Sequence, residues 1–329
     1  MNAIANHKPI DEYLYGYVFI ELFHLANKYK IFQYLIDNTS KSVEQMATDL
    51  DLNANALERI LINLSAEDIL LQRQDHYCIN PAYAPYFDRQ SDGFIGNFIH
   101  FIRNQGRSVL QQLEGHLTNQ KSSQSPYDTL YQTSSDTTNF TQAMWELSYS
   151  TGKGLAQYLP ADCGPIVDIG GGSGALAAAL IQADRRRDIT IFDLPAVQQD
   201  FNCKMREQQL SEQIGFVAGD FFVDTLPDAQ TYFLSYVLSN WAEAKVINLL
   251  SRIAAKVNAN QGQLIIFERL FDADGIKPFP TAVMHLNMML HTEGSHRTED
   301  QYRKLLLKAG FRKFNAIKTP FDKQLLIVS

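Results

Sequence analysis

The chain has 329 residues, of which 45% are hydrophobic and 20% charged, with a formal net charge of −7. This length suffices for two domains with sizeable cores. The negative charge argues against a nucleic-acid partner, because phosphate binding relies on clustered Lys and Arg. Three widely separated cysteines fit neither a disulfide framework nor a paired-cysteine metal site. The polar run from Met1 to Lys8 does not resemble a leader, and no apolar stretch is long enough to span a bilayer. We therefore expect a cytoplasmic protein without a membrane partner.

The first third of the chain is predicted to be mainly helical. Apolar residues recur at helical spacing over residues 10–37, and Ser42 with Gln45 forms a capping box for the next helix. Asn53 caps a further helix, and two short strands follow it. This order predicts a winged helix over residues 1–105. Because the helix after Asn53 is poor in Lys and Arg, a packing or dimerisation module is favoured over a DNA reader.

Residues 106–150 are expected to form a helical linker that contributes to a substrate pocket. They include the polar, low-complexity stretch from Thr118 to Pro126, which is typical of an exposed loop. A helix is predicted after this stretch and leads towards Leu159.

Residues 151–329 predict an α/β domain with a doubly wound, Rossmann-like sheet. Short apolar strands alternate with helical segments, which is typical of parallel βαβ units. The last two strands are joined by a short loop containing Pro320, so they are expected to form an antiparallel hairpin. The seven predicted strands are 166–169, 189–192, 214–217, 230–235, 263–268, 313–318 and 324–328.

A glycine-rich turn follows the first of these strands. The run from Val167 to Gly174 reads Val-Asp-Ile-Gly-Gly-Gly-Ser-Gly and precedes a helix rich in Ala and Leu. Such a turn lets the backbone approach a ligand, and the helix N-terminus offers free N–H groups, so a nucleotide-like ligand is expected. Asp193 ends the next strand, where a ribose-binding carboxylate belongs. These residues alone fit a nicotinamide cofactor as well as an adenosyl cofactor.

Three features favour the adenosyl cofactor. Asp168 lies in the strand just before the glycine-rich turn, where its carboxylate can bind the amino group of an amino-acid-like ligand across that turn. The run Gly219-Asp220-Phe221-Phe222 offers a carboxylate beside aromatic rings, which suits the amino group and flat face of adenine. The predicted terminal hairpin is the third feature.

With these features in place, the chain resembles the class I S-adenosylmethionine-dependent methyltransferases. It is most similar to small-molecule O-methyltransferases of the family 2 type, which carry an N-terminal winged-helix dimerisation domain. The resemblance covers nearly the whole chain and implies S-adenosylmethionine as cofactor, a homodimer, and methyl transfer to an aromatic or secondary-metabolite acceptor, most often at oxygen. It rests on residues 167–174, 192–195, 219–222, 237–241, and 297–299 followed by 309–311.

The resemblance also implies which residues bind. The glycines would line the methionine part of the cofactor, Asp193 would bind the ribose, and Asp220 and Phe221 would hold the adenine. The implied cofactor residues are Asp168, Gly170, Gly172, Gly174, Asp193, Leu194, Gly219, Asp220, Phe221 and Ser235. The implied acceptor residues are Met144, Trp145, Tyr149, Asn240, Trp241, His285, Asn287 and Met288, with Tyr13 to Tyr17 of a partner subunit.

The chain departs from this family at the catalytic base. The family places a histidine two residues before Trp241, and here that position is Ser239, whose hydroxyl is a very weak base. Glu268 occupies the place of one family carboxylate, and His296 replaces the other. We hypothesise that His296, oriented by Glu268, takes the acceptor proton. A metal is not expected, because His285 and His291 lie on different faces of their helix.

Two other functions stay open on the sequence. The Ser239 substitution also fits C- or N-methylation, or non-methylating chemistry such as hydroxylation or a pericyclic reaction that uses the charge of the cofactor. A winged-helix regulator that binds DNA and senses a ligand belongs to another class, which the acidic balance of the chain disfavours.

Overall fold

The computed structural model describes residues 10–110, 113–118, 133–160, 163–321 and 323–329, so most of the expected loop from Thr118 to Pro126 lies outside them. The chain divides into two compact units between Arg107 and Ser108. Each unit has its own hydrophobic core. None of the described helices is both long and apolar enough to cross a membrane.

The first unit confirms the prediction of a mainly helical N-terminal region with a small sheet. Its three strands lie in the order β1-β3-β2 and are antiparallel. The capping box forms as predicted: Gln45 N–H donates to Ser42 Oγ at 3.3 Å, and Ser42 N–H donates to Gln45 Oε1 at 3.1 Å. The elements are α1 (Ile10–Tyr15), α2 (Tyr17–Lys28), α3 (Ile31–Asn38), β1 (Lys41–Ser42), α4 (Val43–Asp49), α5 (Ala54–Ala66), β2 (Leu70–Arg73), β3 (His76–Ile79), α6 (Ala84–Phe87) and α7 (Gly96–Leu110), which runs past the unit boundary.

The second unit begins with short helices and then alternates strands with helices. Before the sheet come α8 (Leu113–Leu117), α10 (Ser134–Leu155) and the 3-10 turn η1 (Ala156–Tyr158). The first half of the sheet region comprises β4 (Pro165–Ile169), α11 (Ala175–Ala183), β5 (Asp188–Asp193), η2 (Pro195–Val197), α12 (Gln198–Glu207) and β6 (Ile214–Ala218). The second half comprises β7 (Thr231–Ser235), η3 (Leu238–Asn240), α13 (Glu243–Asn260), β8 (Gln263–Glu268), β9 (Leu270–Phe271), α14 (Phe279–His291), β10 (Arg297–Thr298), α15 (Glu299–Ala309), β11 (Phe314–Lys318) and β12 (Gln324–Val328).

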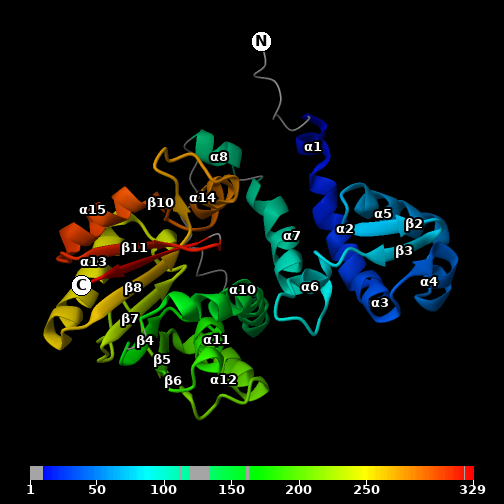
Figure 1. Cartoon of the computed structure of the whole chain (residues 1–329). Helices are drawn as coiled ribbons and strands as arrows, with labels where there is room; N and C mark the ends of the chain where they lie inside the picture. Colours follow the sequence, from blue (N-terminus) through cyan, green and yellow to red (C-terminus); the bar gives the residue numbers. More distant parts are fainter. Residues whose placement is uncertain (1–9, 111–112, 119–132, 161–162, 322) are drawn as a thin grey trace. The chain divides into compact units, whose positions relative to one another are not determined.

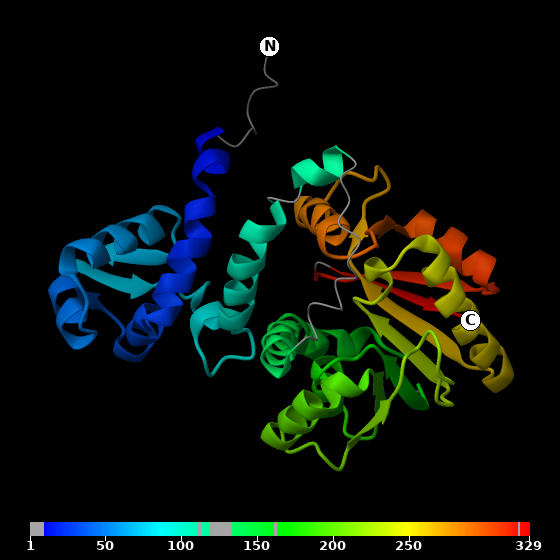
Figure 2. The same cartoon turned by 180° about the vertical axis from the view of Figure 1, so that it is seen from behind.

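The seven-stranded sheet confirms the predicted doubly wound fold. Its order is β11-β12-β8-β7-β4-β5-β6, and β12 is antiparallel to both of its neighbours. Helices α10, α11 and α12 cover one face, while α13 and α15 cover the other (Figures 1 and 2). The chain reverses its direction of winding between β4 and β7, and in open α/β sheets ligands bind beyond the carboxyl ends of the strands at such a point. The glycine turn after β4 lies there.

Helix α10 is part of the second unit, although its residues were expected to belong to a linker. A Cβ on Gly152 would lie 2.7 Å from the Cβ of Ala179 and 3.0 Å from Leu176 Cδ1, so α10 packs closely on α11. Ser173 Oγ also donates to the Thr141 carbonyl at 3.4 Å. The periodicity of an amphipathic helix does not reveal which surface will cover it, so the sequence did not show that α10 packs on α11.

Candidate functional site

The glycine turn forms an open cradle at the carboxyl end of β4. Gly170, Gly172 and Gly174 all adopt the left-handed conformation, with φ of 71°, 59° and 84°. A Cβ on Gly172 would meet no atom within 4 Å, so the space beside its backbone is open. Gly174 is the N-cap residue of α11, and no side chain caps this helix. The backbone here can therefore approach a ligand closely, and the first N–H groups of α11 are available to it.

Asp168 places a buried carboxyl group beside this cradle. Its side chain is 3% exposed, and its Oδ1 atom has no hydrogen-bond partner. Burial raises the pKa of Asp168 to about 8, and the nearby Asp193 carboxyl adds to the rise. A buried polar atom without a partner costs free energy, so this oxygen suits a ligand that carries an ammonium group.

Asp193 connects the turns that follow β4 and β5. Its Oδ2 accepts from Gly172 N–H at 2.8 Å, and its Oδ1 accepts from Leu194 N–H at 2.7 Å. Burial raises the pKa of Asp193 to about 6, while these two hydrogen bonds oppose the rise. Each carboxylate oxygen can accept a second hydrogen bond, so the group can also bind two neighbouring hydroxyls.

The turn after β6 brings aromatic rings to the same edge of the sheet. Gly219 N–H donates to the Asp193 carbonyl at 2.9 Å, and Asp220 Oδ1 accepts from Phe222 N–H at 2.8 Å. The Phe221 ring lies 3.7 Å from where a Cβ on Gly170 would stand. Phe221 and Phe222 are in edge contact at 4.7 Å between ring centroids. The turns that follow β4, β5 and β6 therefore lie side by side at the carboxyl edge of the sheet.

Ser235 ends β7, where it pairs with Phe267 of β8 and is half-buried. Beyond it lies the turn from Tyr236 to Trp241, which contains η3. Ser239 in this turn is 1% exposed. The Asn240 side chain donates its amide N–H to the Tyr236 carbonyl at 2.7 Å, so its orientation is set by the backbone.

Glu268 contacts this turn through backbone hydrogen bonds. Its Oε1 accepts from Leu238 N–H at 2.9 Å and from Ser239 N–H at 3.4 Å, and its Oε2 is buried without a partner. Burial raises the pKa of Glu268 to about 7, and the hydrogen bonds from Ser239 and Leu238 and the charge of Arg297 oppose the rise.

His296 lies on the neighbouring loop with one ring nitrogen unpartnered. Its Nδ1 is 3.2 Å from the Arg269 carbonyl, so Nδ1 carries the proton and donates. Its Nε2 is buried with no hydrogen-bond partner and presents a lone pair. Burial lowers the pKa of His296 to about 4, so the ring is neutral near pH 7. The hydrogen-bond partner that orients the ring is the Arg269 carbonyl, whereas Glu268 was expected in that role.

The predicted acceptor residues come from three elements, which are α10, the turn after β7 and α14. Trp145 and Tyr149 lie on α10 and are 9% and 6% exposed, in the same hydrophobic core as α11. Their rings stack with 5.1 Å between the centroids. Tyr149 Oη also donates to Gln182 Oε1 at 2.6 Å. These two side chains pack in the core of the second unit, and their contact with an acceptor stays a prediction. Met144 is half-buried on the same helix.

The other predicted acceptor residues lie on α14 and the turn after β7. His285 is exposed and accepts from His296 N–H through Nδ1 at 3.2 Å. Asn287 and Met288 are half-buried on the same helix, and Trp241 is half-buried against the rings of Phe221 and Phe222. Over the described ranges, no group of three or more His, Cys, Asp or Glu side chains could hold a metal ion.

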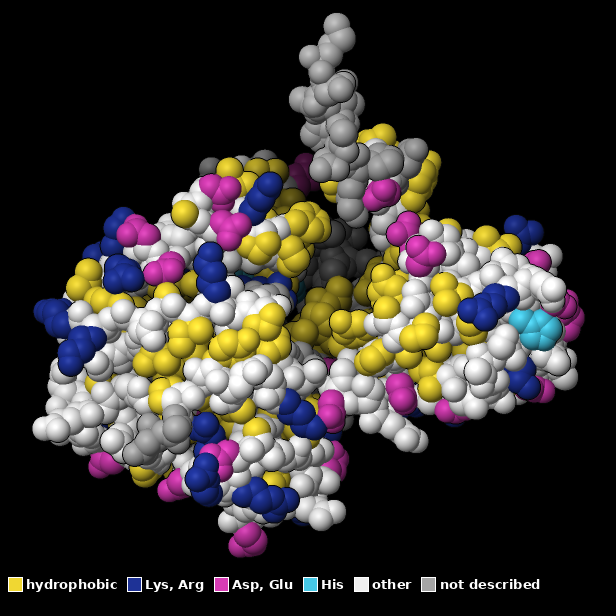
Figure 3. Space-filling model, in the orientation of Figure 1, with side chains coloured by type: hydrophobic (Ala, Val, Ile, Leu, Met, Phe, Trp, Pro, Cys, Tyr) yellow, Lys and Arg dark blue, Asp and Glu magenta, His cyan; other side chains and the backbone are white. Residues whose placement is uncertain are grey.

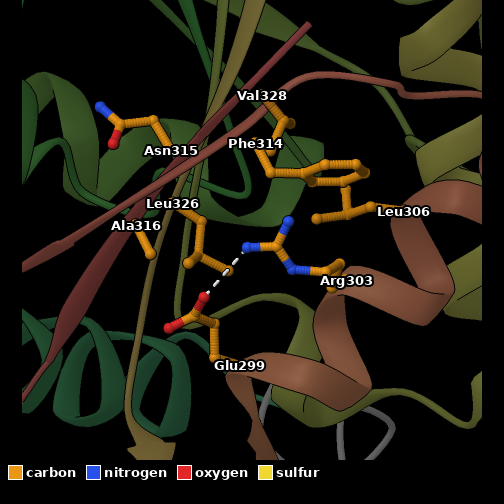
Figure 4. Close-up of a pocket in the computed structure, with 8 residues that line it drawn as sticks. All are labelled: Glu299, Arg303, Leu306, Phe314, Asn315, Ala316, Leu326 and Val328. Atoms are coloured by element: carbon orange, nitrogen blue, oxygen red, sulfur yellow. Dashed lines mark hydrogen bonds and ion pairs between the residues drawn. The ribbon is translucent and has the colours of Figure 1, made fainter.

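A surface hollow lies at the opposite edge of the sheet, between α15 and the terminal hairpin (Figure 4). Glu299 and Arg303, one turn apart on α15, form an ion pair of 3.2 Å on one wall of the hollow, and the Arg303 guanidinium lies over the Phe314 ring. Strands β12, β8 and β7 separate this edge from β4. None of the predicted site residues lines the hollow, so we assign no role to it.

Two features of the site were missed on the sequence. Lys323, in the loop between the last two strands, is 1% exposed, and its Nζ lies 4.2 Å from the Tyr236 ring centroid. Arg297 and Gly294 contact the backbone of the turn that carries Ser239. The Arg297-Thr298 pair was noticed as a motif, but nothing in a linear pattern shows which backbone atoms an arginine will reach.

Comparisons with known proteins agree with this fold. A family model of the O-methyltransferase domain matches residues 106–312. Acetylserotonin O-methyltransferase of Homo sapiens is 37% identical over 198 residues, which cover 59% of this chain and 56% of that protein. The enzyme of the same name from Macaca mulatta is 32% identical over 239 residues, which cover 71% and 66%. The matches thus span about half to two thirds of the length of these curated relatives.

Two solved structures extend the likeness over almost the whole chain. The structure of human N-acetylserotonin methyltransferase in complex with SAM superposes with a TM-score of 0.86 at 25% identity, covering 100% of this chain and 99% of that one. PigF with SAH gives a TM-score of 0.85 at 22% identity, covering 97% and 98%, and this likeness concerns the fold alone.

Proposed function

The chain belongs to the O-methyltransferase family, and from this premise we propose that it transfers a methyl group from S-adenosylmethionine to the oxygen of a small-molecule acceptor. The observation that carries the proposal is the convergence of the glycine cradle, Asp168 and Asp193 at the carboxyl ends of β4 and β5.

The residues at this edge fit S-adenosylmethionine. The unpartnered Asp168 oxygen would take the ammonium group, and the remaining acceptor capacity of Asp193 suits a ribose diol. Phe221, with Asp220 and Leu194, would hold the adenine, and Gly170, Gly172 and Gly174 would admit the ligand close to the backbone. Gly219 and Ser235 would complete this end of the site. When bound, S-adenosylmethionine supplies a methyl group on a positively charged sulfur.

The protein must then orient the acceptor and receive its proton. Positioning the two reactants is the larger contribution, because the sulfonium is already activated. We keep the hypothesis that His296 accepts the proton, since its Nε2 presents a buried lone pair. An imidazole with a pKa near 4 is a weak base, so this step favours acceptors with acidic hydroxyls.

The base hypothesis has a direct test. His296→Ala should lower methyl transfer to a phenol about 100-fold, while Ser239→Ala should lower it far less. Wild-type activity in His296→Ala would assign the proton to another group, of which Glu268 is the next candidate because its pKa is near 7.

The function itself is tested with methyl-labelled S-adenosylmethionine and a panel of phenols, keto acids and amines. N-acetylserotonin is the first phenol to try, because two relatives are named for it. We expect label in an O-methylated product. Saturable binding of the cofactor by wild type and its loss in Gly172→Val serve as the control. Absence of cofactor binding would overturn the proposal.

A second function is favoured by one observation. Ser239 and Asn240 occupy the turn where the family carries its base, and neither is a strong base. Carbon or nitrogen methylation, or a reaction that leaves the methyl group on the cofactor, needs no such base. The same assay separates the cases: label on carbon or nitrogen indicates the first, and unlabelled product that forms only with the cofactor indicates the second.

We also propose that the chain forms a homodimer through its N-terminal unit. Helix α1 and the start of α2 expose large hydrophobic side chains, which are rarely left in contact with water over such a short segment. They are Ile10, Tyr13, Leu14, Tyr15 and Tyr17, each at least 57% exposed.

A further inference from the structure

Side chains from other elements bind the backbone of the turn from Tyr236 to Trp241. Tyr236 adopts a left-handed conformation with φ of 58°, which is uncommon for a residue with a side chain and favours glycine. A backbone in such a conformation persists only where its surroundings stabilise it. The residues after Tyr236 are contacted by groups from β8, from β10 and from the loop before β10.

The N–H groups of the turn are held by a carboxylate. Glu268 at the end of β8 accepts from both Leu238 N–H and Ser239 N–H through Oε1, at 2.9 and 3.4 Å. The residue is completely buried. Because water does not compete for these hydrogen bonds, their loss would leave two donors without partners.

The carbonyl groups of the same turn are held by a guanidinium. Arg297 is 7% exposed, and its Nη1 donates to the Leu238 carbonyl at 3.0 Å and to the Ser295 carbonyl at 3.0 Å. Its Nη2 donates to the Trp241 carbonyl at 3.1 Å. The planar fork of arginine thus binds the first carbonyl of η3 and the carbonyl of the residue that follows η3. A lysine ammonium, with a single nitrogen, cannot reproduce this geometry.

The third contact is the close approach of Gly294. A Cβ at this position would overlap the Ser239 carbonyl oxygen and would stand 2.5 Å from Trp241 N. Both contacts are to backbone atoms, which cannot swing aside as the end of a side chain can. Any larger residue at 294 must therefore displace the turn or the loop that leads into Arg297 and β10.

We propose that Arg297 and Gly294 are positioning residues, which hold the turn from Leu238 to Trp241 against Glu268 and thereby fix Ser239 and Trp241 at the acceptor side of the site. The proposal rests on the proposed function, because it assigns this turn to the acceptor. Arg297 acts through the backbone of the turn and contacts no reacting atom. Misplacing a group by about 1 Å can lower a rate about 100-fold.

The test compares Arg297→Lys, Arg297→Met and Gly294→Ala with a matched control. Arg312 is another arginine that donates to two backbone carbonyls, those of Leu307 and Phe311, but it is exposed and lies on a different loop. Arg312→Met therefore removes hydrogen bonds of the same kind at a place that does not contact the turn. Gly294→Ala keeps the arginine, so it tests the turn even where Arg297→Met folds poorly.

The first readout is amide hydrogen exchange, which can be measured before the methyl-accepting substrate is known. We expect residues 238–241 to exchange at least about 10-fold faster in both Arg297 variants and in Gly294→Ala, with S-adenosylmethionine affinity within about twofold of wild type. Arg312→Met should leave this segment unchanged. Unchanged exchange in the Arg297 variants, or a uniform increase across the second unit with loss of cofactor binding, overturns the proposal.

The second readout is the kinetics with whichever phenol of the panel the wild type methylates. We expect kcat to fall about 10- to 100-fold with KM for S-adenosylmethionine retained, and Arg297→Lys to restore little of it. Equal kcat in the variants and wild type overturns the positioning role. If wild type binds no cofactor, the proposed function fails. The exchange rates of residues 238–241 still show whether Arg297 and Gly294 hold the turn.

Discussion

At the scale of single residues, Asp168 and Asp193 show how burial can prepare a binding site. Two carboxyl groups lie close together at the ends of neighbouring parallel strands, and each is at least 92% removed from solvent. Burial raises the pKa of both, to about 8 for Asp168 and about 6 for Asp193. Buried carboxyl groups with raised pKa values are frequent at functional sites, which agrees with the proposed role of these two residues in cofactor binding.

Cofactor binding should consequently depend on pH. Below pH 8 Asp168 holds a proton in the cofactor-free protein, and an ammonium ligand binds best to the carboxylate, so binding releases the proton. We expect the affinity for S-adenosylmethionine to rise from pH 6 towards pH 8, and to rise no further once the ligand itself loses its ammonium proton. Titration calorimetry in buffers of different ionisation enthalpy measures both the affinity and the protons released.

Asp168→Asn is the matched variant for this prediction. It should bind S-adenosylmethionine about 10- to 100-fold more weakly and lose most of the pH dependence. Asp300→Asn, which changes an exposed carboxylate on α15, should alter neither. Release of a proton by Asp168→Asn equal to that of wild type would assign the effect to another group.

At the scale of elements, helix α10 packs on α11 over one face of the sheet. It packs along α11 through Gly152 and through the stacked rings of Trp145 and Tyr149. The small side chains of α11 make this approach possible, since Ala177, Ala178 and Ala179 are all buried. Trp145 and Tyr149, which are predicted acceptor residues, thus also contribute to the packing of α10 on α11.

A larger side chain at Gly152 should destabilise this contact. Gly152→Leu would force its Cβ to within 2.7 Å of Ala179 and should lower the free energy of unfolding by about 1–3 kcal/mol. Ser150→Leu is the control, because Ser150 is exposed on the same helix and the change should be within about 0.5 kcal/mol. Urea denaturation followed by circular dichroism measures both. Equal stability of the two variants would mean that α10 is not tightly packed there.

At the scale of the whole molecule, the two units have different surfaces and separate cores. Figure 3 shows Lys and Arg side chains interspersed with Asp and Glu on the visible face, without a continuous basic surface. This mixed charge is unlike a nucleic-acid binding face. The N-terminal unit instead exposes the hydrophobic residues of α1 and α2.

The proposed dimer should depend on these side chains. Leu14→Asp combined with Tyr17→Asp places charge in the apolar segment and should shift the protein from twice the mass of one chain to a single chain in light scattering. Ile62→Asp is the control, since Ile62 is exposed on α5 of the same unit. A wild-type protein that is a monomer at micromolar concentration would exclude the dimer.

The sequence by itself determined the features that depend on local pattern. The capping box of Ser42, the seven strands and the glycine turn each follow from a few neighbouring residues, because propensity and periodicity act over short distances. The antiparallel hairpin followed from the shortness of one loop. The position of Asp193 was also predictable, because β4 and β5 are parallel and their last residues therefore lie at the same edge of the sheet.

Only the tertiary structure decided what lies against what. It placed Trp145 and Tyr149 in a core, gave His296 the Arg269 carbonyl as its partner, and brought Gly294 and Arg297 onto the backbone of the turn at Ser239. The hydrogen bond of His296 joins residues 27 positions apart along the chain, and that of Arg297 to Leu238 joins residues 59 positions apart. Such pairings depend on how whole elements pack, and the pattern within any one segment does not encode them.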